Sequence, residues 1–339
     1  MNRRGRLAVA TSAAFPDLLE DWPILQGALA GQGIDAVTRV WSDPGVAWGD
    51  FDLVLANGAW DNIHHPARFC AWAEQVSRAT RLVNPPPVLR WNIDKHYLAD
   101  LAADGIATVP TTYLAPGQDP GAALGLHREF VVKPTISGGG FESARYGDTG
   151  GDRRRATAHV ARLHAAGRTA MLQPYLASVD HHGEKGLVFL GGELSHTIAK
   201  NPLLVPGAGV RDDLSTDQVI TATTATEAEA DVARAALAAA GARLGPATYA
   251  RVDLVELPSA TPAVLELELL DPALFFDTDP PRLSRPSWNL KVVLRSGCCR
   301  EAGSELIETD PKRRNHQPCQ HHTRRPPLAR TCALCPASA

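Results

Sequence analysis

Charged side chains alternate with apolar ones in two stretches that are otherwise typical of buried β-strands. The sequence YARVDLV places Arg251 and Asp253 on one strand face, because successive side chains of a strand point to opposite faces. The sequence VLELEL repeats this arrangement with Glu266 and Glu268. If the two strands pair, three mutually repelling carboxylates converge, and such a group is stable mainly around a cation. Oxygen ligands suit Mg²⁺, so the pair predicts a magnesium site, whereas either strand alone is more typical of a solvated amphipathic hairpin.

A lysine followed by several glycines forms a second candidate site. Lys133 ends the apolar run FVV, and Ser137, Gly138, Gly139 and Gly140 follow shortly after it. A cation beside a loop with many free backbone N–H groups is what a polyphosphate requires. The segment matches neither the Walker pattern nor the dinucleotide fingerprint, so a surface lysine before a flexible turn stays an alternative.

The composition restricts the class of protein. With 339 residues the chain can form two or three packed lobes. No apolar run approaches the roughly 20 residues of a membrane-spanning helix, so we expect no membrane association. Residues 281–339 carry 11 Lys and Arg against 4 Asp and Glu, which leaves 23 against 33 in the rest of the chain. This acidic body argues against nucleic-acid binding, which needs clustered basic side chains.

Cysteine usage indicates the compartment. Of the six cysteines, only Cys70 precedes residue 290. Structural disulfides belong to oxidising compartments, and a single cysteine in the body cannot form one within the body. We therefore expect a cytoplasmic protein.

The segment 280–339 differs from the rest of the chain. It is rich in Cys, Arg and Pro and has no apolar periodicity, so we expect little packed structure there. Cys332 and Cys335, with Cys319 and His321 nearby, supply soft ligands for zinc, although their spacing fits no zinc module well. The abrupt change in composition instead favours translation in a shifted reading frame.

Strands and helices alternate over the first ninety residues, as in parallel α/β units. The pattern predicts strands at 7–11, 36–41, 52–56 and 81–83, and helices at 21–30 and 66–79. The triplet Pro85–Pro87 predicts neither helix nor sheet at that point. A helix is predicted over residues 95–103, with Asp94 as its N-cap and Gly105 at its end.

Short strands with glycine turns dominate after residue 129. The pattern predicts strands at 130–133, 170–173, 183–190, 193–200, 249–256 and 263–270, and helices at 153–166 and 227–240. Gly191 and Gly192 supply the positive φ angles of an antiparallel hairpin. Residues 202–224 show little periodicity and predict a mobile loop. The elements together predict a fold of mixed α/β and α+β class.

The ordered motifs over residues 6–278 resemble those of the ATP-grasp superfamily. Within it they are most similar to the branch of glutathione synthetase-like ligases and of the ligase that closes the cycloserine ring. The segments WNIDK, which ends at Lys95, and VVKP, which contains Lys133, resemble the two nucleotide-lysine segments of the family. The residues from Ser137 to Gly140 resemble its phosphate-covering loop.

Further motifs extend this resemblance. The segment QPYL, with Gln173, Tyr175 and Leu176, is similar to the hinge between the two grasp lobes, whose backbone holds adenine in the family. Glu184 lies further along, toward the ribose, and Arg251 falls at the phosphate arginine. The family's magnesium ligands correspond to Asp253, Glu266 and Glu268.

The resemblance implies an ATP-grasp fold preceded by an N-terminal parallel α/β domain, the pre-ATP-grasp domain. The implied divisions are 1–90 for the N-terminal domain, 91–172 for the lid subdomain, 173–279 for the C-terminal subdomain with the metal site, and 280–339 for the tail.

The function implied by the resemblance is that of an ATP-dependent ligase. It would activate a carboxylate as an acylphosphate for attack by an amine, with ATP and Mg²⁺ as cofactors and Mn²⁺ as an alternative. The expected partners are a small-molecule carboxylate and amine, and a homodimer is left open. Arg251 is the expected catalytic residue, and Lys200 a candidate for binding a substrate carboxylate. An ATP-grasp kinase and a non-catalytic nucleotide-binding protein are the alternatives.

Several positions depart from the resembling sequences. Those sequences usually carry an arginine and a serine near Asn57 and a polar pair near Lys185. Glu268 stands where many ATP-grasp enzymes have asparagine, and Asp271 replaces a longer acid. These changes leave the predicted nucleotide site intact, and they leave the identity of the acceptor open.

Overall fold

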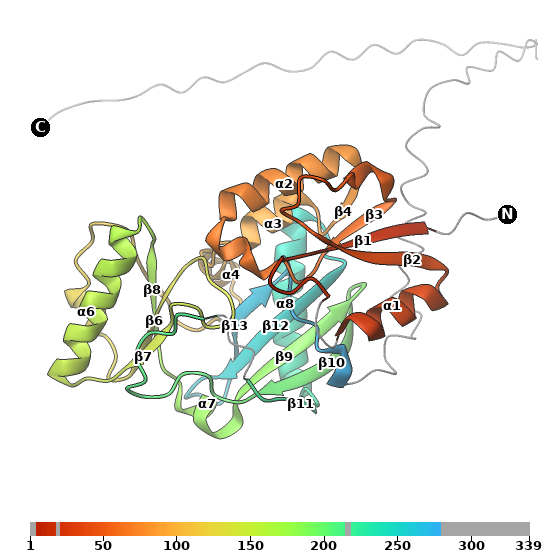
Figure 1. Ribbon diagram of the computed structural model, residues 1–339. Helices are drawn as coiled ribbons and strands as arrows, with labels where there is room; N and C mark the ends of the chain where they lie inside the picture. Colours follow the sequence, from red (N-terminus) through yellow and green to blue (C-terminus); the bar gives the residue numbers. More distant parts are fainter. Residues whose placement is uncertain (1–4, 18–20, 214–217, 279–339) are drawn as a thin grey trace, which may run out of the picture. The chain divides into compact units, whose positions relative to one another are not determined.

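Three β-sheets organise the chain in the computed structural model, which describes residues 5–17, 21–213 and 218–278 (Figure 1). The first sheet is parallel, has the order β2-β1-β3-β4, and occupies the N-terminal part of the chain. Its strands are β1 (Gly5–Thr11), β2 (Ile34–Val40), β3 (Leu53–Ala56) and β4 (Arg81–Val83). This is the parallel α/β unit that the alternation of strands and helices predicted.

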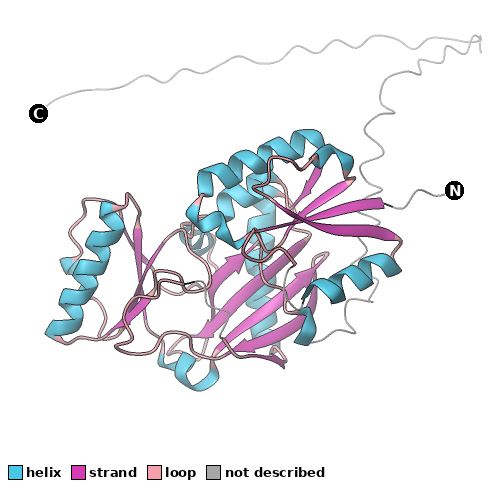
Figure 2. Ribbon diagram, in the orientation of Figure 1, coloured by secondary structure: helices cyan, strands magenta, loops and turns pink. Residues whose placement is uncertain are grey.

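Helices cover both faces of this parallel sheet (Figure 2). On one face Leu7 and Val9 pack with Leu25 and Leu29 of α1 (Asp21–Gly31). On the other face lie Ala8 and Ala10 of β1 with an aromatic group, which comes from α2 (Pro66–Ala79) and from the segment between β2 and β3. Short 3-10 turns span Trp48–Asp50 and Trp60–His64. Both faces of β1 are buried, which explains its continuous apolar run.

The segment after β4 contradicts one sequence prediction. The helix α3 (Pro86–Asn92) begins at the second proline of the triplet that was expected to exclude a helix. The expectation was wrong because the first turn of a helix has no partner for its N–H groups, so proline is tolerated there. The next helix, α4 (Tyr97–Ala103), begins two residues later than predicted. The amide of Lys95 instead donates to the carbonyl oxygen of Thr135 at 2.9 Å.

The second sheet is antiparallel and has the order β5-β8-β6-β7. Its strands are β5 (Thr112–Leu114), β6 (Phe130–Pro134), β7 (Ala144–Tyr146) and β8 (Ala170–Pro174). The long helix α6 (Gly150–Ala165) packs Val160 and Leu163 on its buried face, and the short helix α5 (Gly121–Leu124) completes this core. The sequence did not predict β5 and β7, which have only three residues each.

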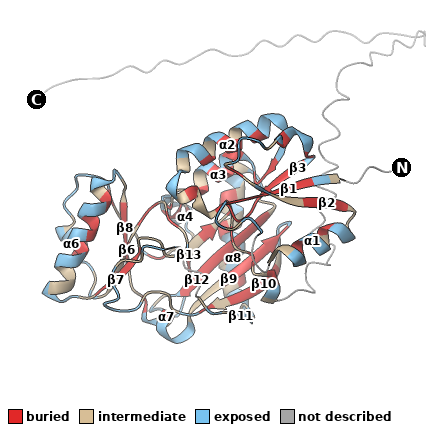
Figure 3. Ribbon diagram, in the orientation of Figure 1, coloured by how far each residue is buried: buried red, intermediate tan, exposed pale blue. Residues whose placement is uncertain are grey.

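The third sheet is antiparallel and has the order β11-β10-β9-β12-β13. Its strands are β9 (Glu184–Leu190), β10 (Glu193–Lys200), β11 (Ile220–Thr223), β12 (Tyr249–Glu256) and β13 (Pro262–Glu268). The hairpin of β9 and β10 turns at Gly191 and Gly192, both with positive φ, as predicted. Figure 3 shows that the central strands of this sheet are largely buried.

The alanine-rich helix α8 (Glu227–Leu244) covers one face of the third sheet. It begins with a capping box, in which Thr226 accepts from the amide of Glu229 and the Glu229 side chain accepts from the amide of Thr226. Small side chains such as Ala233 and Ala236 let the helix approach the strands closely. The short helix α7 (Ala177–His182) follows β8, and a last 3-10 turn spans Phe276–Thr278.

Two further predictions concern loops. Residues 202–224 were expected to be a mobile loop, but this stretch contains β11, which pairs with β10. Four residues of the stretch, 214–217, lie outside the described residues, as does the whole segment 279–339, to which the predictions about the tail refer. Among the helices of the described residues, none is long and apolar enough to cross a bilayer.

Candidate active site

The strands β12 and β13 pair so that the four alternating charges meet. In the antiparallel register Arg251 lies opposite Glu268, and Asp253 lies opposite Glu266. A register shift follows immediately after Asp253. We call these four residues the carboxylate patch. The pairing that the alternation predicted is therefore present, and it brings together three carboxylates and a guanidinium.

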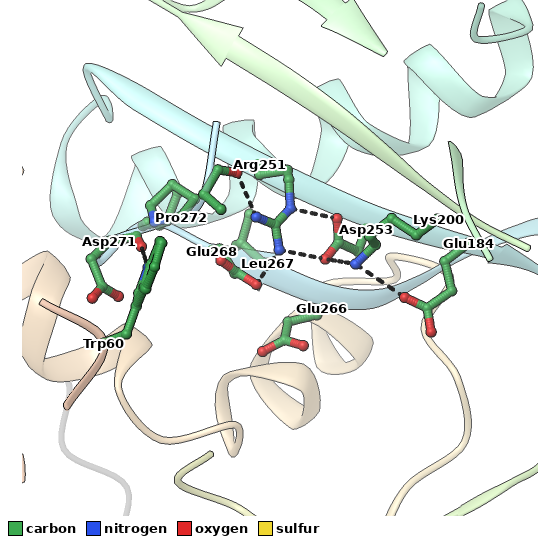
Figure 4. A network of polar contacts seen from close by, with 12 residues as sticks. Trp60, Glu184, Lys200, Arg251, Asp253, Glu266, Leu267, Glu268, Asp271 and Pro272 are labelled. Atoms are coloured by element: carbon green, nitrogen blue, oxygen red, sulfur yellow. Dashed lines mark hydrogen bonds and ion pairs between the residues drawn. The ribbon is translucent and has the colours of Figure 1, made fainter. Parts of the chain in front are cut away.

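Ion pairs connect the patch to β9 and β10 (Figure 4). Arg251 donates from Nε to Asp253 Oδ1 at 2.8 Å and from Nη2 to Asp253 Oδ2 at 3.0 Å. It also binds Glu268 and donates to the carbonyl oxygen of Ala273 at 2.6 Å. Lys200 Nζ lies 2.8 Å from Asp253 Oδ2 and 3.1 Å from Glu184 Oε2. Both cations are thus fully engaged by acceptors of the protein.

The electrostatics of the patch follow from this pairing. Burial alone would raise the pKa of Asp253, but Arg251 and Lys200 hold that pKa well below its usual range. Burial raises the pKa of Glu268 to about 7, despite the nearby Arg251. In the reverse sense, Asp253 and Glu184 raise the pKa of Lys200 although burial opposes this. The two cations are therefore held charged, whereas the carboxylates differ in how readily they take up a proton.

The donor set of the patch fits a hard cation. One oxygen from each of Asp253, Glu266 and Glu268 lies within 4.8 Å of the other two, and this is the one such group of His, Cys, Asp and Glu side chains within the described part of the chain. Oxygen atoms alone suit Mg²⁺. The residues present therefore fit the metal that the sequence predicted.

Lys95 and Lys133 both lie close enough to Glu266 to lower its pKa, and they differ in their partners. Lys95 Nζ lies 2.9 Å from Glu266 Oε1 and also binds the carbonyl oxygen of Ser137. Lys133 Nζ makes no hydrogen bond or ion pair with any residue that the structure describes. Burial lowers the pKa of Lys133, and the nearby charges of Glu266 and Glu184 offset this desolvation only in part. Lys133 is thus a half-buried cation without a hydrogen-bond or ion-pair partner among the described residues.

The segment of residues 136–143, which we call the glycine-rich loop, connects β6 to β7. Gly139 and Gly140 have φ angles of 56° and 74°, which a residue with a side chain rarely adopts. Turns within the loop are closed by hydrogen bonds from the amide of Phe141 to Gly138 and from the amide of Ser143 to Gly140. The amides of residues 137–140 donate to no acceptor among the described residues. Such a row of free N–H groups is a site for anionic oxygen atoms.

A pocket of about 550 Å³ joins these groups. Fourteen of the fifteen predicted site residues line it. The exception is Asp253, which is 1% exposed and lies behind Arg251 and Lys200. The lining residues are Lys95, Lys133, Ser137, Gly138, Gly139, Gly140, Gln173, Tyr175, Leu176, Glu184, Lys200, Arg251, Glu266 and Glu268.

The pocket extends beyond the predicted residues toward the parallel sheet. This second part is lined by aromatic side chains, among them Phe15, Trp60 and Phe275, and by acids, among them Asp21 and Asp271. Trp60 Nε1 donates to the carbonyl oxygen of Asp271 at 3.1 Å. Trp60 follows the carboxyl end of β3, and ligands of open parallel sheets usually bind at that edge. This rule was the one sequence signal that could have found Trp60.

Two positions that departed from the resembling sequences have structural partners. Asn57 Nδ2 donates to the carbonyl oxygen of Pro272 at 2.6 Å and is buried. Lys185 Nζ donates to Glu229 Oε2 at 2.9 Å, at the start of α8. Both side chains therefore join elements of the protein and do not line the pocket.

Comparisons with known proteins identify the family of the chain. Residues 7–84 match the N-terminal domain of the D-cycloserine synthetase DcsG. The chain is 42% identical over 280 residues to the cycloserine biosynthesis protein DcsG of Streptomyces lavendulae, which covers 80% of this chain and 92% of that protein. The crystal structure of D-cycloserine synthetase DcsG matches with a TM-score of 0.78 and 39% identity, over 86% of this chain and 100% of that one.

The chain belongs to the ATP-grasp ligases, as a homologue of DcsG. It is an ATP-dependent carboxylate–amine ligase, and both the predicted fold and the predicted class of reaction are confirmed. A D-alanine–D-alanine ligase of Bacillus anthracis in complex with ATP shares the fold of this ATP-grasp ligase, with a TM-score of 0.54, 14% identity, and coverage of 86% of this chain and 96% of that one. So does the ATP-grasp ligase PsnB in complex with Mg and ADP, with a TM-score of 0.56, 14% identity, and coverage of 87% and 99%.

Proposed function

We propose that this ligase binds ATP and Mg²⁺ in the pocket and activates a substrate carboxylate as an acylphosphate, which a nitrogen nucleophile then attacks. The observation that carries the proposal is the unpaired Lys133, which lines the same pocket as the free amides of residues 137–140 and the carboxylates of Glu266 and Glu268. A largely desolvated cation without a partner is costly, so Lys133 indicates an anionic ligand. A polyphosphate supplies the negatively charged oxygen atoms that Lys133 and the amides of residues 137–140 lack as partners.

The roles of the nucleotide-site residues follow from their positions. Lys95, Lys133 and the glycine-rich loop hold the phosphates, and the backbone from Gln173 to Leu176 holds the adenine. Tyr175 and Leu176 would line the adenine site, and Glu184 would bind the ribose. Asp253, Glu266 and Glu268 hold the metal, which when bound neutralises charge on the phosphate oxygens.

Arg251 and Lys200 act as fixed positive charges in this proposal. Arg251 is held by Asp253, Glu268 and the carbonyl oxygen of Ala273, so it needs no reorganisation during the reaction. A preorganised charge at the transferring phosphoryl group lowers the barrier by roughly 3 kcal/mol. Lys200 is held equally firmly and keeps Asp253 ionised.

The proposed reaction has two chemical steps. An oxygen atom of the substrate carboxylate attacks the γ-phosphorus of ATP, the bond from this phosphorus to the bridging oxygen breaks, and ADP leaves. The nitrogen lone pair then attacks the acyl carbon, the bond from this carbon to the phosphate oxygen breaks, and inorganic phosphate leaves. The nitrogen loses one proton, and the product is an amide.

The similarity to DcsG suggests which substrate to try first. Cycloserine is a ring closed by an amide-type bond between a carbonyl carbon and a nitrogen, and opening this bond with water gives O-amino-D-serine. A ligase that forms the ring therefore needs the carboxylate and the nitrogen in one molecule. The second part of the pocket, with Asp21, Asp271 and Trp60, offers acids and an aromatic wall to an amino acid of this size. We propose that the chain closes this ring.

The test measures products from Mg-ATP and O-amino-D-serine. The expected result is equal amounts of ADP, inorganic phosphate and cycloserine, with the Lys133→Met variant inactive as the control. A phosphorylated product without phosphate release would identify a kinase. Release of ADP with other amino acids, but not with this one, would reject the substrate and keep the ligase. Absence of any stabilisation of the wild type by Mg-ATP in thermal unfolding would reject the nucleotide site itself.

A further inference from the structure

One side chain binds both ends of the glycine-rich loop. Arg168 lies in the turn between α6 and β8 and forms an ion pair through Nη1 with Glu142 near the end of the loop. Its Nη2 donates to the carbonyl oxygen of Ile136, the first residue of the loop, at 2.6 Å. The planar guanidinium thus spans the loop through two parallel hydrogen bonds, which a lysine ammonium could not do in the same geometry.

Glu142, the ion-pair partner of Arg168, has an unusual backbone conformation. Glu142 has a φ angle of 52°, in the left-handed region that side chains disfavour. Its amide donates to the carbonyl oxygen of Arg211 at 2.8 Å, and the amide of Arg211 donates to Ser143 at 3.1 Å. A conformation of this kind persists only where its surroundings hold it. The ion pair with Arg168 is one of the contacts that hold Glu142.

Arg168 itself does not line the pocket, whereas Ser137 and the three glycines do. The Arg168 side chain is 26% exposed and that of Glu142 is 19% exposed, so their charge pair is partly shielded from water. On the pocket side, Lys95 binds the carbonyl oxygen of Ser137. The loop is therefore held from both sides, by Lys95 within the site and by Arg168 behind it.

We propose that Arg168 and Glu142 are positioning residues for nucleotide binding: together they keep the glycine-rich loop in the conformation that directs its free amides at the β- and γ-phosphates. This inference rests on the proposed function, because it assumes that the loop covers the phosphates. It goes further in assigning the phosphate geometry to a pair of residues outside the pocket. A pair that only stabilised the fold would affect all ligands equally.

The experiment compares the affinities of Arg168→Ala for ATP, ADP and AMP with those of the wild type. Loss of a charge-assisted hydrogen-bond pair predicts roughly 10- to 100-fold weaker binding of ATP and ADP, while the affinity for AMP stays unchanged. In steady-state kinetics KM for ATP rises, and KM for the amino-acid substrate does not. Arg168→Lys, which keeps the charge, restores part of the affinity. Glu142→Gln reproduces the loss.

The matched control is Arg155→Ala, on α6. Arg155 pairs with Asp152 at 2.5 Å and its side chain is 58% exposed, and we expect its nucleotide affinities to equal those of the wild type. Equal weakening of ATP and AMP by Arg168→Ala, or unchanged ATP affinity in a variant with a lowered Tm, would overturn the inference. If Arg168→Ala does not fold, Arg168→Lys and Glu142→Gln decide by the same ratio of ATP to AMP affinity. Failure of the wild type to bind ATP would instead contradict the proposed function.

Discussion

The carboxylate patch and the glycine-rich loop face the same pocket, yet they satisfy their polar groups in opposite ways. In the patch, Arg251 and Asp253 are bound by other side chains on regular strands. In the loop, the amides of residues 137–140 have no acceptor within the described residues, and Lys133 nearby has none either. The Arg251–Asp253 pair of the patch already has its partners within the protein, whereas the donors of the loop still need a ligand.

This difference teaches which groups position and which groups bind. Paired charges such as Lys200 hold their neighbours in place, and loss of Lys200 leaves Glu184 without its cation and Asp253 with Arg251 alone. Unpaired donors such as Lys133 do not stabilise the ligand-free protein, because they gain partners only when a ligand binds. Stability and nucleotide affinity should therefore separate when the two kinds of residue are changed.

The largest expected effect comes from replacing two lysines of the pocket, Lys200 and Lys133, by methionine, one at a time. Lys200→Met leaves Glu184 without its cation and Asp253 with Arg251 alone, and we expect it to lower the free energy of unfolding by about 3 kcal/mol. Lys133→Met removes an unpaired, half-buried charge, so we expect a change below about 1 kcal/mol together with loss of ATP binding. Denaturant unfolding and calorimetric titration with Mg-ATP measure the two quantities. Equal destabilisation by both substitutions would refute the distinction between paired and unpaired charges.

A second prediction compares how the ionisation of Asp21, which lies outside the carboxylate patch, and of Asp253, which is paired within it, makes the stability depend on pH. Asp21 accepts from the amides of Phe275 at 3.0 Å and Phe276 at 2.6 Å, and burial raises its pKa to about 6. Between pH 4 and 6 the folded state therefore holds a proton that the unfolded state has released. The free energy of unfolding should fall by about 2 to 3 kcal/mol as the pH rises through this range. Asp253, whose pKa is lowered, acts oppositely, and its contribution is lost only below pH 4.

The measurement is the free energy of unfolding at several pH values between 4 and 7 for the wild type and Asp21→Asn. The wild-type value minus the variant value should decrease with rising pH, since asparagine does not titrate. A difference that stays constant over this range would show that Asp21 has an ordinary pKa in the folded protein.

The same comparison explains what could be predicted from the sequence. The patch was predictable because strand alternation fixes which side chains share a face, and Arg251 and Asp253 needed only a partner strand. The contacts of the glycine-rich loop were not, because Arg168 lies 32 residues from Ile136 and no local pattern connects them. The sequence gives the loop's glycines, while its anchors depend on how α6 packs against the second sheet.

Other misses have equally specific causes. The helix that begins at Pro86 was excluded because proline was judged by its effect within a helix and not at its first turn. The strand β11 was missed because Ile220–Thr223 is a partly exposed edge strand without clear alternation. The acids and aromatic residues of the second part of the pocket lie in loops, in a short 3-10 turn (Trp60) or at the first residue of a helix (Asp21), where side-chain spacing carries no periodic signal.

The smallest expected effect concerns a glycine of the loop. Gly140 has a φ angle of 74°, and a Cβ atom there would lie 2.5 Å from Leu203 Cδ2. Gly207 has a nearly equal φ of 75° but open space around it, so it provides a matched control. Both alanine substitutions should cost about 1 kcal/mol of stability for the backbone conformation. Gly140→Ala should in addition raise KM for ATP several-fold, because the loop must move away from Leu203.

The double variant Gly140→Ala/Leu203→Ala isolates the steric part of this effect. Removing the Leu203 side chain takes away the atom that the new methyl group would meet, so KM for ATP should return toward that of Leu203→Ala alone. The backbone cost, measured by unfolding, should stay. If Gly207→Ala raised KM for ATP as much as Gly140→Ala, backbone strain alone would account for the change, and the position of the loop against Leu203 would have no part in nucleotide binding.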